Sequence, residues 1–332
     1  MISDRIELLL KLKNYILEND TPFQEVKLQA ERMNGWFTQE FINKALDTIC
    51  NNYLEESELI VLASQIIPVE EKNTQMKIGI TMAGNIPLVG FHDFLCVFLS
   101  GHPQFIKLST KDEVLLKHFI LKLQEWDSSL KESILISDFL KGCNAYIATG
   151  SNNSARYFEK YFANYPHIIR RNRSSVAILT GEETTEELLA LADDIYMYFG
   201  LGCRNVTQIY VPKGYSFEPL LQIFKKYEAL QHHNKYRNNI DYNLAVFILN
   251  QQYYMSNDSL LMIENDSIFS AIGVLHYSFY TELQPILTSL QTSPDVQAII
   301  GRDYITFGKA QLPSLFDFAD GVNTIEFLNN LN

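Results

Sequence analysis

Short apolar runs alternate with longer amphipathic stretches between residues 77 and 230, and this alternation limits the possible folds more than any other feature. The apolar runs have the length of strands, whereas the intervening stretches have the length and apolar spacing of helices. Strands that alternate with helices of this length imply right-handed parallel crossovers and doubly wound sheets. The predicted strands are residues 78–82, 105–108, 145–148, 176–179, 206–211 and, after a polar loop at 232–239, 245–249.

The chain is long enough for two domains, because its 332 residues compare with about 100–200 in a typical domain. Residues 1–70 carry the apolar spacing of helices, and the strand–helix units begin only after them. We place the boundary at the basic run 170–173, which separates two series of such units. The sequence thus predicts an α/β protein of two doubly wound domains, one spanning residues 1–172 with an N-terminal helical segment and one spanning residues 173–332.

Composition restricts the compartment and the partners. A formal net charge of -12 argues against a nucleic-acid partner. The four cysteines are scattered without a CxxC pair or a metal-ligand spacing, so we expect reduced thiols and no metal site. The N-terminus lacks the pattern of a signal peptide, and the most apolar stretch, residues 86–99, is too short to span a bilayer. A cytoplasmic protein without a membrane span is the expectation.

Cys203 follows two glycines at the point where a predicted helix gives way to a predicted strand. Gly200 and Gly202 keep side chains away from the thiol and let a ligand approach the backbone. An accessible thiolate at such a turn is suited to nucleophilic attack. An unpaired cysteine is more often an inert packing residue, and we accept that interpretation for the other three. No histidine adjoins Cys203 in the sequence, so formation of its thiolate requires a spatial partner, a helix end or the charge of a cofactor. The basic run 170–173 and Arg204 are candidate partners.

Asn85 lies in a loop rich in glycine and proline, between a predicted strand and a predicted helix. A side-chain amide at that position is able to donate a hydrogen bond to an oxyanion that develops during a reaction. The thiol of Cys203 and the amide of Asn85 together indicate acyl chemistry.

Polar side chains also follow two other predicted strands of the first domain. Lys107, Ser109 and Lys111 end one strand and open a helix, where Lys107 and Ser109 are placed to hold the ribose of an adenine nucleotide and Lys111 to meet a 2′-phosphate. The turn 149–151, Thr149-Gly150-Ser151, repeats this geometry, with Asn152 and Asn153 able to cap the next helix. Taken alone, each segment is better explained as a capped, solvated helix start, with Ser109 or Thr110 as the cap of the first. No GxGxxG motif is present, so spacing alone does not establish a nucleotide site.

Several segments in their order along the chain resemble the LuxC-like acyl-CoA reductases, a branch of the aldehyde dehydrogenase superfamily. The resemblance covers most of the chain from about residue 75 onward. It is carried by residues 84–88, 99–102, 107–112, 149–151, 172–175, 199–203, 308–315 and 320–321.

This resemblance implies an acylating aldehyde dehydrogenase that reduces an acyl thioester, such as a fatty acyl-CoA, to an aldehyde. Residues 1–172 then form a Rossmann-like domain that binds NADP(H), and residues 173–332 form the catalytic domain. Cys203 is the implied acyl-accepting nucleophile, and Asn85 with the Cys203 backbone N–H is the implied oxyanion site. Lys107 is the implied ribose contact, and Gly150 with Ser151 lies near the diphosphate and nicotinamide end of the cofactor.

Departures from the superfamily pattern refine the expectation. Hydrolytic members carry a glutamate in a Glu-Leu-Gly-Gly-Lys segment where this chain has residues 170–174, so water is not activated and the acyl group is expected to be reduced. A second glutamate, which grips the nicotinamide ribose in the superfamily, aligns weakly with Ser267 of the segment 267–270. Members that prefer NAD often have an acidic residue three positions after the lysine. Here Thr110 and Lys111 follow instead, which favours NADPH.

Other interpretations stay open. A cysteine-dependent acyltransferase or thioesterase would use Cys203 without any nucleotide, and a catalytically silent scaffold would keep the fold for partner binding. The acyl group arrives on CoA, on an acyl carrier protein or from an acyl-activating protein, and the sequence does not distinguish these donors. Members of the superfamily usually form dimers or tetramers, so a homo-oligomer is compatible with the resemblance.

Overall fold

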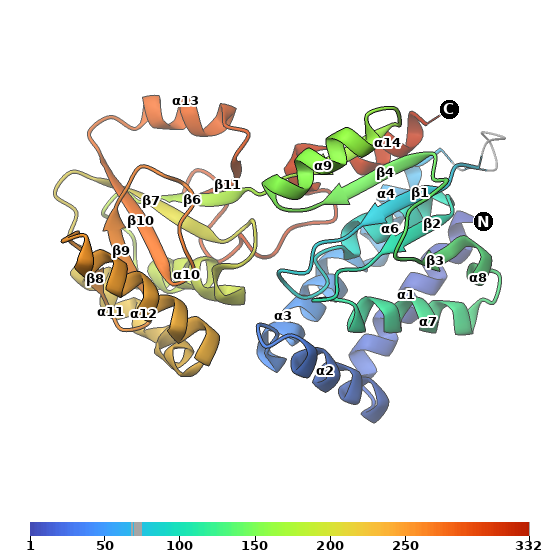
Figure 1. Cartoon of the computed structure of the whole chain (residues 1–332), viewed down its shortest axis with the longest axis horizontal. Coiled ribbons are helices and arrows are strands. Elements are labelled where there is room, and N and C mark those ends of the chain that lie inside the picture. The colour runs from blue at the N-terminus through green and yellow to red at the C-terminus, as the bar shows by residue number, and fades with distance from the viewer. Residues whose placement is uncertain (68, 70–74, 332) are drawn as a thin grey trace. The chain divides into compact units, whose positions relative to one another are not determined.

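The computed structural model describes residues 1–67, 69 and 75–331. The chain divides into two compact units, one made of residues 1–172 and 313–332 and the other of residues 173–312 (Figure 1). The segment 313–332, which the sequence-based division places in the second domain, groups instead with the first unit, because Leu315, Ile325 and Leu328 are buried in its core. The helices predicted up to residue 70 extend in part over residues 68 and 70, which lie outside the described residues.

The first unit contains a fully parallel sheet of five strands in the order β3-β2-β1-β4-β5. In Figure 1 helix α9 lies on one side of this sheet and helices α1 and α7 lie on the other, as right-handed crossovers in opposite directions require. The strands are β1 (Ile78–Thr81), β2 (Gln104–Lys107), β3 (Ile134–Ile136), β4 (Ala145–Thr149) and β5 (His167–Arg170).

Helices surround this sheet, and α6 is the most deeply placed of them. Nine residues of α6 are buried, and seven of these are apolar, as expected for a helix inside the core. The helices of the unit are α1 (Ile2–Glu18), α2 (Thr21–Met33), α3 (Gln39–Thr48), the π-helical η1 (Ile49–Tyr53), α4 (Glu56–Ser64), α6 (Phe91–Ser100), α7 (Val114–Trp126), α8 (Leu130–Ser133), α9 (Asn152–Phe162), η4 (Ala319–Gly321) and α14 (Thr324–Asn329).

The second unit contains a six-stranded sheet in the order β11-β6-β7-β10-β9-β8, parallel except for the edge pair β9–β8. Its strands are β6 (Ser174–Ile178), β7 (Val206–Pro212), β8 (Met255–Ser256), β9 (Leu261–Glu264), β10 (Val274–Tyr280) and β11 (Val296–Ile300). Its helices are α10 (Thr185–Tyr196), η2 (Met197–Gly200), α11 (Glu218–Ile223), η3 (Phe224–His232), α12 (Asn234–Leu249) and α13 (Gln284–Thr292). Among the described helices of either unit, none is long and apolar enough to cross a membrane.

Alternate residues of the central strands face two separate cores. Ile209 of β7 packs with side chains from α10 and α11, whereas Tyr210 packs with Leu287 and Leu290 of α13. This alternation is the period of two that a strand imposes on its side chains. The second unit is therefore a three-layer α/β structure, and both units confirm the predicted parallel α/β class.

The strand predicted at 245–249 is wrong, and so is most of the polar loop predicted before it. Both segments belong to the continuous helix α12, whose start is capped by His233 through an acceptor bond from the Tyr236 N–H at 3.3 Å. Tyr236, Ile240 and Phe247 are the buried residues of α12. A short apolar run fits either a strand or one turn of a buried helix. Here the packing of these three buried residues selects the helix.

Candidate functional site

The carboxyl ends of three neighbouring strands bring the predicted cofactor residues to one edge of the first sheet. Thr81 at the end of β1 is in register with Lys107 of β2 and with Ala148 of β4. The loop 82–90 and the turn 149–151 therefore leave the sheet at the same edge. The strand order reverses between β1 and β4, and open α/β sheets bind ligands at such a switch point.

The loop that carries Asn85 packs tightly on the segment after β2. A Cβ added to Gly84 would lie 2.5 Å from the Ser109 Oγ and 3.1 Å from the Asp112 Cβ, so only glycine allows this approach. Leu88 adopts a φ of 58°, an uncommon conformation for a residue with a side chain. The Asn85 loop and the predicted ribose segment thus form one packed structure within the first unit.

Asp112 holds this structure together and was missed as a functional residue by the sequence analysis. Its buried carboxyl group accepts hydrogen bonds from the backbone N–H groups of Leu88 and Val89. Burial raises the pKa of Asp112 well above its usual range, and these two hydrogen bonds offset only part of that shift. Its Oδ1 has no hydrogen-bond partner in the described part of the chain. The group therefore keeps its proton at a pH where an exposed aspartate is ionised.

The predicted ribose segment presents its lysines to solvent. Lys107 and Lys111 are exposed, whereas Ser109 is half-buried and its Oγ accepts the Lys111 N–H at 3.3 Å. Asn34, which lies just after α2, donates its side-chain amide to the Lys111 carbonyl oxygen at 3.1 Å. The N-terminal helical segment therefore fixes the backbone from which the Lys111 ammonium group projects.

The turn 149–151 starts helix α9. The Ser151 Oγ accepts the Ser154 N–H at 3.3 Å, so Ser151 is the cap, and the expectation that Asn152 or Asn153 caps this helix is wrong. The Gly150 N–H donates to the Arg170 carbonyl oxygen at 3.2 Å, which ties the turn to β5. A helix that begins at the carboxyl edge of a sheet offers backbone N–H groups to a phosphate.

Cys203 lies in the second unit, in the turn between η2 and β7, and is half-buried. The other three cysteines are buried, as predicted. Burial raises the pKa of Cys50 to about 12 and that of Cys143 to about 11, and it raises the pKa of Cys96 well above its usual range. These three thiols are therefore protonated at neutral pH, and Cys203 is the only cysteine with solvent access in the described part of the chain.

The backbone immediately before this turn is strained. Tyr198, Phe199 and Gly200 are three consecutive residues in the left-handed region, with φ of 54°, 57° and 73°. Such conformations persist only where the surrounding structure holds them, and they cluster at functional sites. The ring of Phe199 is buried and packs against His233, with ring centroids 4.4 Å apart.

Hydrogen bonds hold the two sides of the Cys203 turn. The Ser175 hydroxyl donates to the Cys203 carbonyl oxygen at 3.1 Å, and the Gly202 N–H donates to the Asn205 Oδ1 at 2.8 Å. Ser175 and Asn205 are both fully buried. Neither residue was predicted from the sequence, in which Asn205 stands out only as a polar residue directly before an apolar strand.

The three arginines of the basic run 170–173 make contacts within their own units. Arg170 forms a buried ion pair with Asp93, and Arg171 pairs with Glu159; all four residues belong to the first unit. Arg173 donates to the Val296 carbonyl oxygen at 3.4 Å in the second unit. These contacts give Arg170 and Arg171 structural roles within the first unit, and the activation of Cys203 by the basic run stays a prediction.

Asn85 and Cys203 belong to different compact units. The structure joins Asn85 to Ser109 and Asp112 in one unit, and joins Cys203 to Ser175 and Asn205 in the other. The predicted pairing of Asn85 with Cys203 around an oxyanion stays a prediction.

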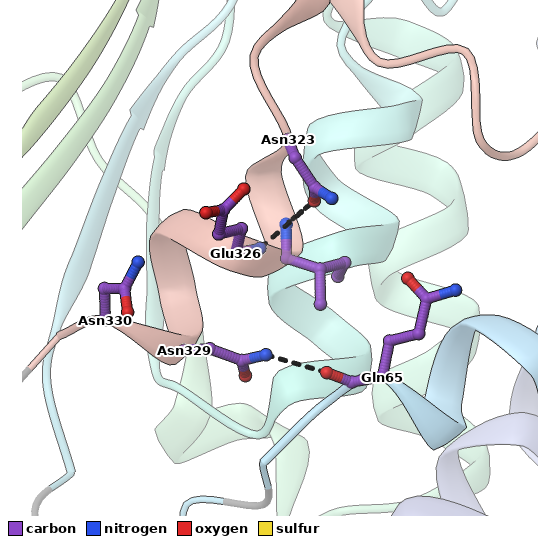
Figure 2. Close-up of a pocket in the computed structure, with 6 residues that line it drawn as sticks. Gln65, Asn323, Glu326, Asn329 and Asn330 are labelled. Carbon is purple, nitrogen blue, oxygen red and sulfur yellow. Dashed lines mark hydrogen bonds between the residues drawn. The ribbon is translucent and has the colours of Figure 1, made fainter.

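A polar groove in the first unit, between the end of α4 and α14, lies apart from all of these residues (Figure 2). The Asn329 Nδ2 donates to the Gln65 carbonyl oxygen at 2.7 Å, and the Asn323 Oδ1 accepts the N–H of Glu326 at 3.1 Å. These side chains cap α14 and attach it to α4, so the groove has a structural explanation. Within the residues that the structure describes, no group of three or more His, Cys, Asp and Glu side chains is placed to hold a metal ion.

The sequence matches no protein-family model and no curated protein sequence. The structure, however, is similar to solved aldehyde dehydrogenases. An NAD+ complex of the Bacillus cereus enzyme has a TM-score of 0.66 at 12% identity, covering 90% of this chain and 71% of that chain. The NAD-dependent aldehyde dehydrogenase of Sinorhizobium meliloti has a TM-score of 0.68 at 10% identity, covering 94% and 72%.

A third structure, 3,6-anhydro-L-galactose dehydrogenase in complex with NAP, has a TM-score of 0.66 at 13% identity, covering 90% of this chain and 74% of that chain. At this identity the likeness establishes the fold alone. The chain therefore has an aldehyde-dehydrogenase-like fold, as the sequence predicts.

Proposed function

We propose that this protein is a nicotinamide-dependent oxidoreductase that reduces an acyl thioester to an aldehyde through an acyl group bound to Cys203. The observation that carries the proposal is a half-buried thiol, held in a strained and hydrogen-bonded turn, on an aldehyde-dehydrogenase-like fold. The likeness to structures described as complexes with NAD+ and NAP supports the nucleotide.

The residues at the carboxyl edge of the first sheet fit a dinucleotide phosphate. Lys107 and Lys111 supply exposed positive charge, and the start of α9 supplies backbone N–H donors at the same edge. Lys111 is the residue that we expect to meet a 2′-phosphate, so NADPH is the proposed cofactor. When bound, NADPH supplies the hydride that reduces the acyl carbon.

The chain's own residues perform the acyl transfer. The sulfur of Cys203 attacks the thioester carbonyl carbon, and the carbon–sulfur bond to the departing thiol, CoA or another carrier, then breaks. The thiol proton of Cys203 leaves in the same exchange, so that one thioester and one thiol are consumed and one of each is formed. The Cys203 N–H and the Asn85 amide hold the negative charge on the carbonyl oxygen, and each such donor contributes about 3–4 kcal/mol to lowering the barrier.

The absence of a general base favours reduction over hydrolysis. Residues 170–174 carry no carboxylate to activate water, and Arg170 is occupied by Asp93. An acyl group on Cys203 thus persists until hydride reaches it, and the resulting thiohemiacetal releases the aldehyde.

Spectrophotometric NADPH oxidation with a panel of acyl-CoAs tests the proposal. We expect turnover by the wild-type chain, loss of turnover in Cys203→Ala, and retained turnover in the matched control Cys143→Ala, because Cys143 is buried. Equal activity in Cys203→Ala would contradict the proposal. If the panel gives no turnover, the assay is repeated with an acyl group on acyl carrier protein. Turnover with this donor would identify a different carrier, whereas its absence would indicate a different reaction.

A cysteine-dependent acyltransferase or thioesterase without a nucleotide is the competing function. Thermal stability in the presence of NADPH distinguishes the two, since a ligand at about 100 times its Kd adds roughly 2.7 kcal/mol to the free energy of unfolding. We expect this stabilisation. Its absence, together with release of free acid from acyl-CoA, would favour the competing function.

A further inference from the structure

Asn205 is a fully buried asparagine at the junction of α10, η2 and β7. Its Nδ2 donates to the carbonyl oxygens of Asp194, Ile195 and Met197 at 3.0, 3.3 and 2.8 Å. The last carbonyls of a helix have no partner within the helix, so this amide satisfies the end of α10. Its Oδ1 accepts the Gly202 N–H at 2.8 Å.

The hydrogen bonds of Asn205 span the strained residues. Met197 precedes the three left-handed residues 198–200, and Gly202 follows them. One buried side chain therefore bonds to the backbone on both sides of the strained segment. A strained backbone persists only where the surrounding structure holds it in this way.

The backbone of Asn205 also controls the peptide that precedes the thiol. Its N–H donates to the Gly202 carbonyl oxygen at 3.1 Å. The Gly202–Cys203 peptide is planar and trans, so the Cys203 N–H points away from that carbonyl oxygen. Fixing the Gly202 carbonyl oxygen consequently fixes the direction of the Cys203 N–H, the group that the proposed function assigns to the oxyanion.

We infer that Asn205 is a positioning residue that holds the Cys203 turn in its strained conformation and aims the Cys203 N–H at the reacting carbonyl oxygen. The inference about the oxyanion rests on the proposed function, whereas the holding of the turn does not. Asn205 touches no reacting atom. It acts through Gly202 and through the carbonyl oxygens at the end of α10.

Asn205→Ala, compared with Asn257→Ala, tests this role. Asn257 is another buried asparagine of the second unit, but its side chain bonds to the Leu221 carbonyl oxygen, the Tyr196 hydroxyl and Ser259. None of these bonds reaches the backbone of residues 197–203. We expect the release of p-nitrophenol from p-nitrophenyl acetate, which requires an oxyanion site, to be slower by roughly a hundredfold in Asn205→Ala. Alkylation of Cys203 by iodoacetamide, which has no oxyanion, should change by less than about fivefold. Asn257→Ala should acylate at nearly the wild-type rate.

Equal losses of acylation in the two variants, or an unchanged rate in Asn205→Ala, would overturn the oxyanion role. Asn205→Asp, which keeps the acceptor for Gly202 but loses the donors to α10, provides a second variant if alanine does not fold. It should recover part of the acylation rate.

Hydrogen exchange of the Gly202 amide tests the holding of the turn without any substrate. We expect this amide to exchange at least tenfold faster in Asn205→Ala than in the wild type or in Asn257→Ala. An unchanged exchange rate would overturn the holding role. A wild type that is not acylated, with slow Gly202 exchange that accelerates in Asn205→Ala, would refute the proposed function and leave the holding role of Asn205 supported.

Discussion

The buried ion pair between Asp93 and Arg170 gives a stability prediction that is independent of any substrate. The Arg170 Nε and Nη2 donate to the two carboxylate oxygens of Asp93 at 3.1 and 2.7 Å, and Nη2 also donates to the Thr324 Oγ1 at 2.9 Å. Nη1 donates to the Ala319 carbonyl oxygen. The guanidinium group thus joins β5, α6 and the C-terminal segment 313–332.

Asp93→Asn removes the negative charge and leaves the Arg170 cation buried, since only 3% of that side chain is exposed. Breaking a buried pair by removal of one partner costs about 3–5 kcal/mol. For a unit of this size, 1 kcal/mol shifts Tm by roughly 2–4 °C, so we expect Tm to fall by about 6–20 °C. Arg171→Met is the matched control, because the neighbouring pair Arg171–Glu159 is exposed and should contribute less than about 1 kcal/mol.

Tryptophan fluorescence follows this unfolding specifically, because both tryptophans of the chain, Trp36 and Trp126, lie in the first unit. Burial alone would raise the pKa of Asp93, but Arg170 holds it below its usual value. The stabilisation is therefore present above the unfolded pKa, near 3.9, and is lost as pH falls through the lower folded value. Asp93→Asn should remove this part of the acid sensitivity. A loss below about 1 kcal/mol, equal to that of Arg171→Met, would refute the reasoning.

Three further substitutions probe the carboxyl edge of the first sheet. Measured by titration calorimetry, the Kd for NADPH should rise about tenfold in Lys111→Ala, and the Kd for NADH should stay unchanged. Equal shifts of the two Kd values would show that Lys111 does not bind a 2′-phosphate. Gly84→Ala should lower turnover at least roughly tenfold and leave Cys203 alkylation unchanged, because the new Cβ would lie 2.5 Å from the Ser109 Oγ and displace the Asn85 loop. Unaltered turnover would show that the loop accommodates the methyl group. Asp112→Asn should increase the free energy of unfolding of the first unit at pH 8, measured by urea titration. The folded pKa of Asp112 is raised, so this group stabilises the fold below pH ~4 and that contribution is lost as pH rises. Equal stability of the two chains would contradict this.

The parallel α/β organisation followed from the sequence because five of the strands are apolar runs next to a clear helical pattern. β1, β2, β4, β6 and β7 all overlap a predicted strand. The short edge strands β3 and β5 were not predicted, since three or four residues carry little periodicity. The strands after α12, which are β8, β9, β10 and β11, were not predicted either. Helix α12 was mistaken for a loop and a strand, because its first turns are rich in asparagine, a weak helix former, and only packing of its buried face makes it helical.

The candidate site followed from the sequence only in part. Cys203, Lys107, Lys111 and the turn 149–151 were recognisable because glycines and strand ends mark them locally. Asp112 was not recognisable, since its role depends on contact with Leu88 and Val89, more than twenty positions earlier in the chain. The role of Asn205 was not predictable either, because its bonds to carbonyl groups at the end of α10 depend on how the turn folds.

Trapping the acyl-enzyme shows directly whether Cys203 carries the acyl group. Wild-type protein is incubated with an acyl-CoA in the absence of nucleotide, and its intact mass and its peptides are measured. We predict one acyl group per chain, attached to Cys203, which is discharged as an aldehyde when NADPH is added. An acyl group on another residue, or its discharge as a free acid, would contradict the account.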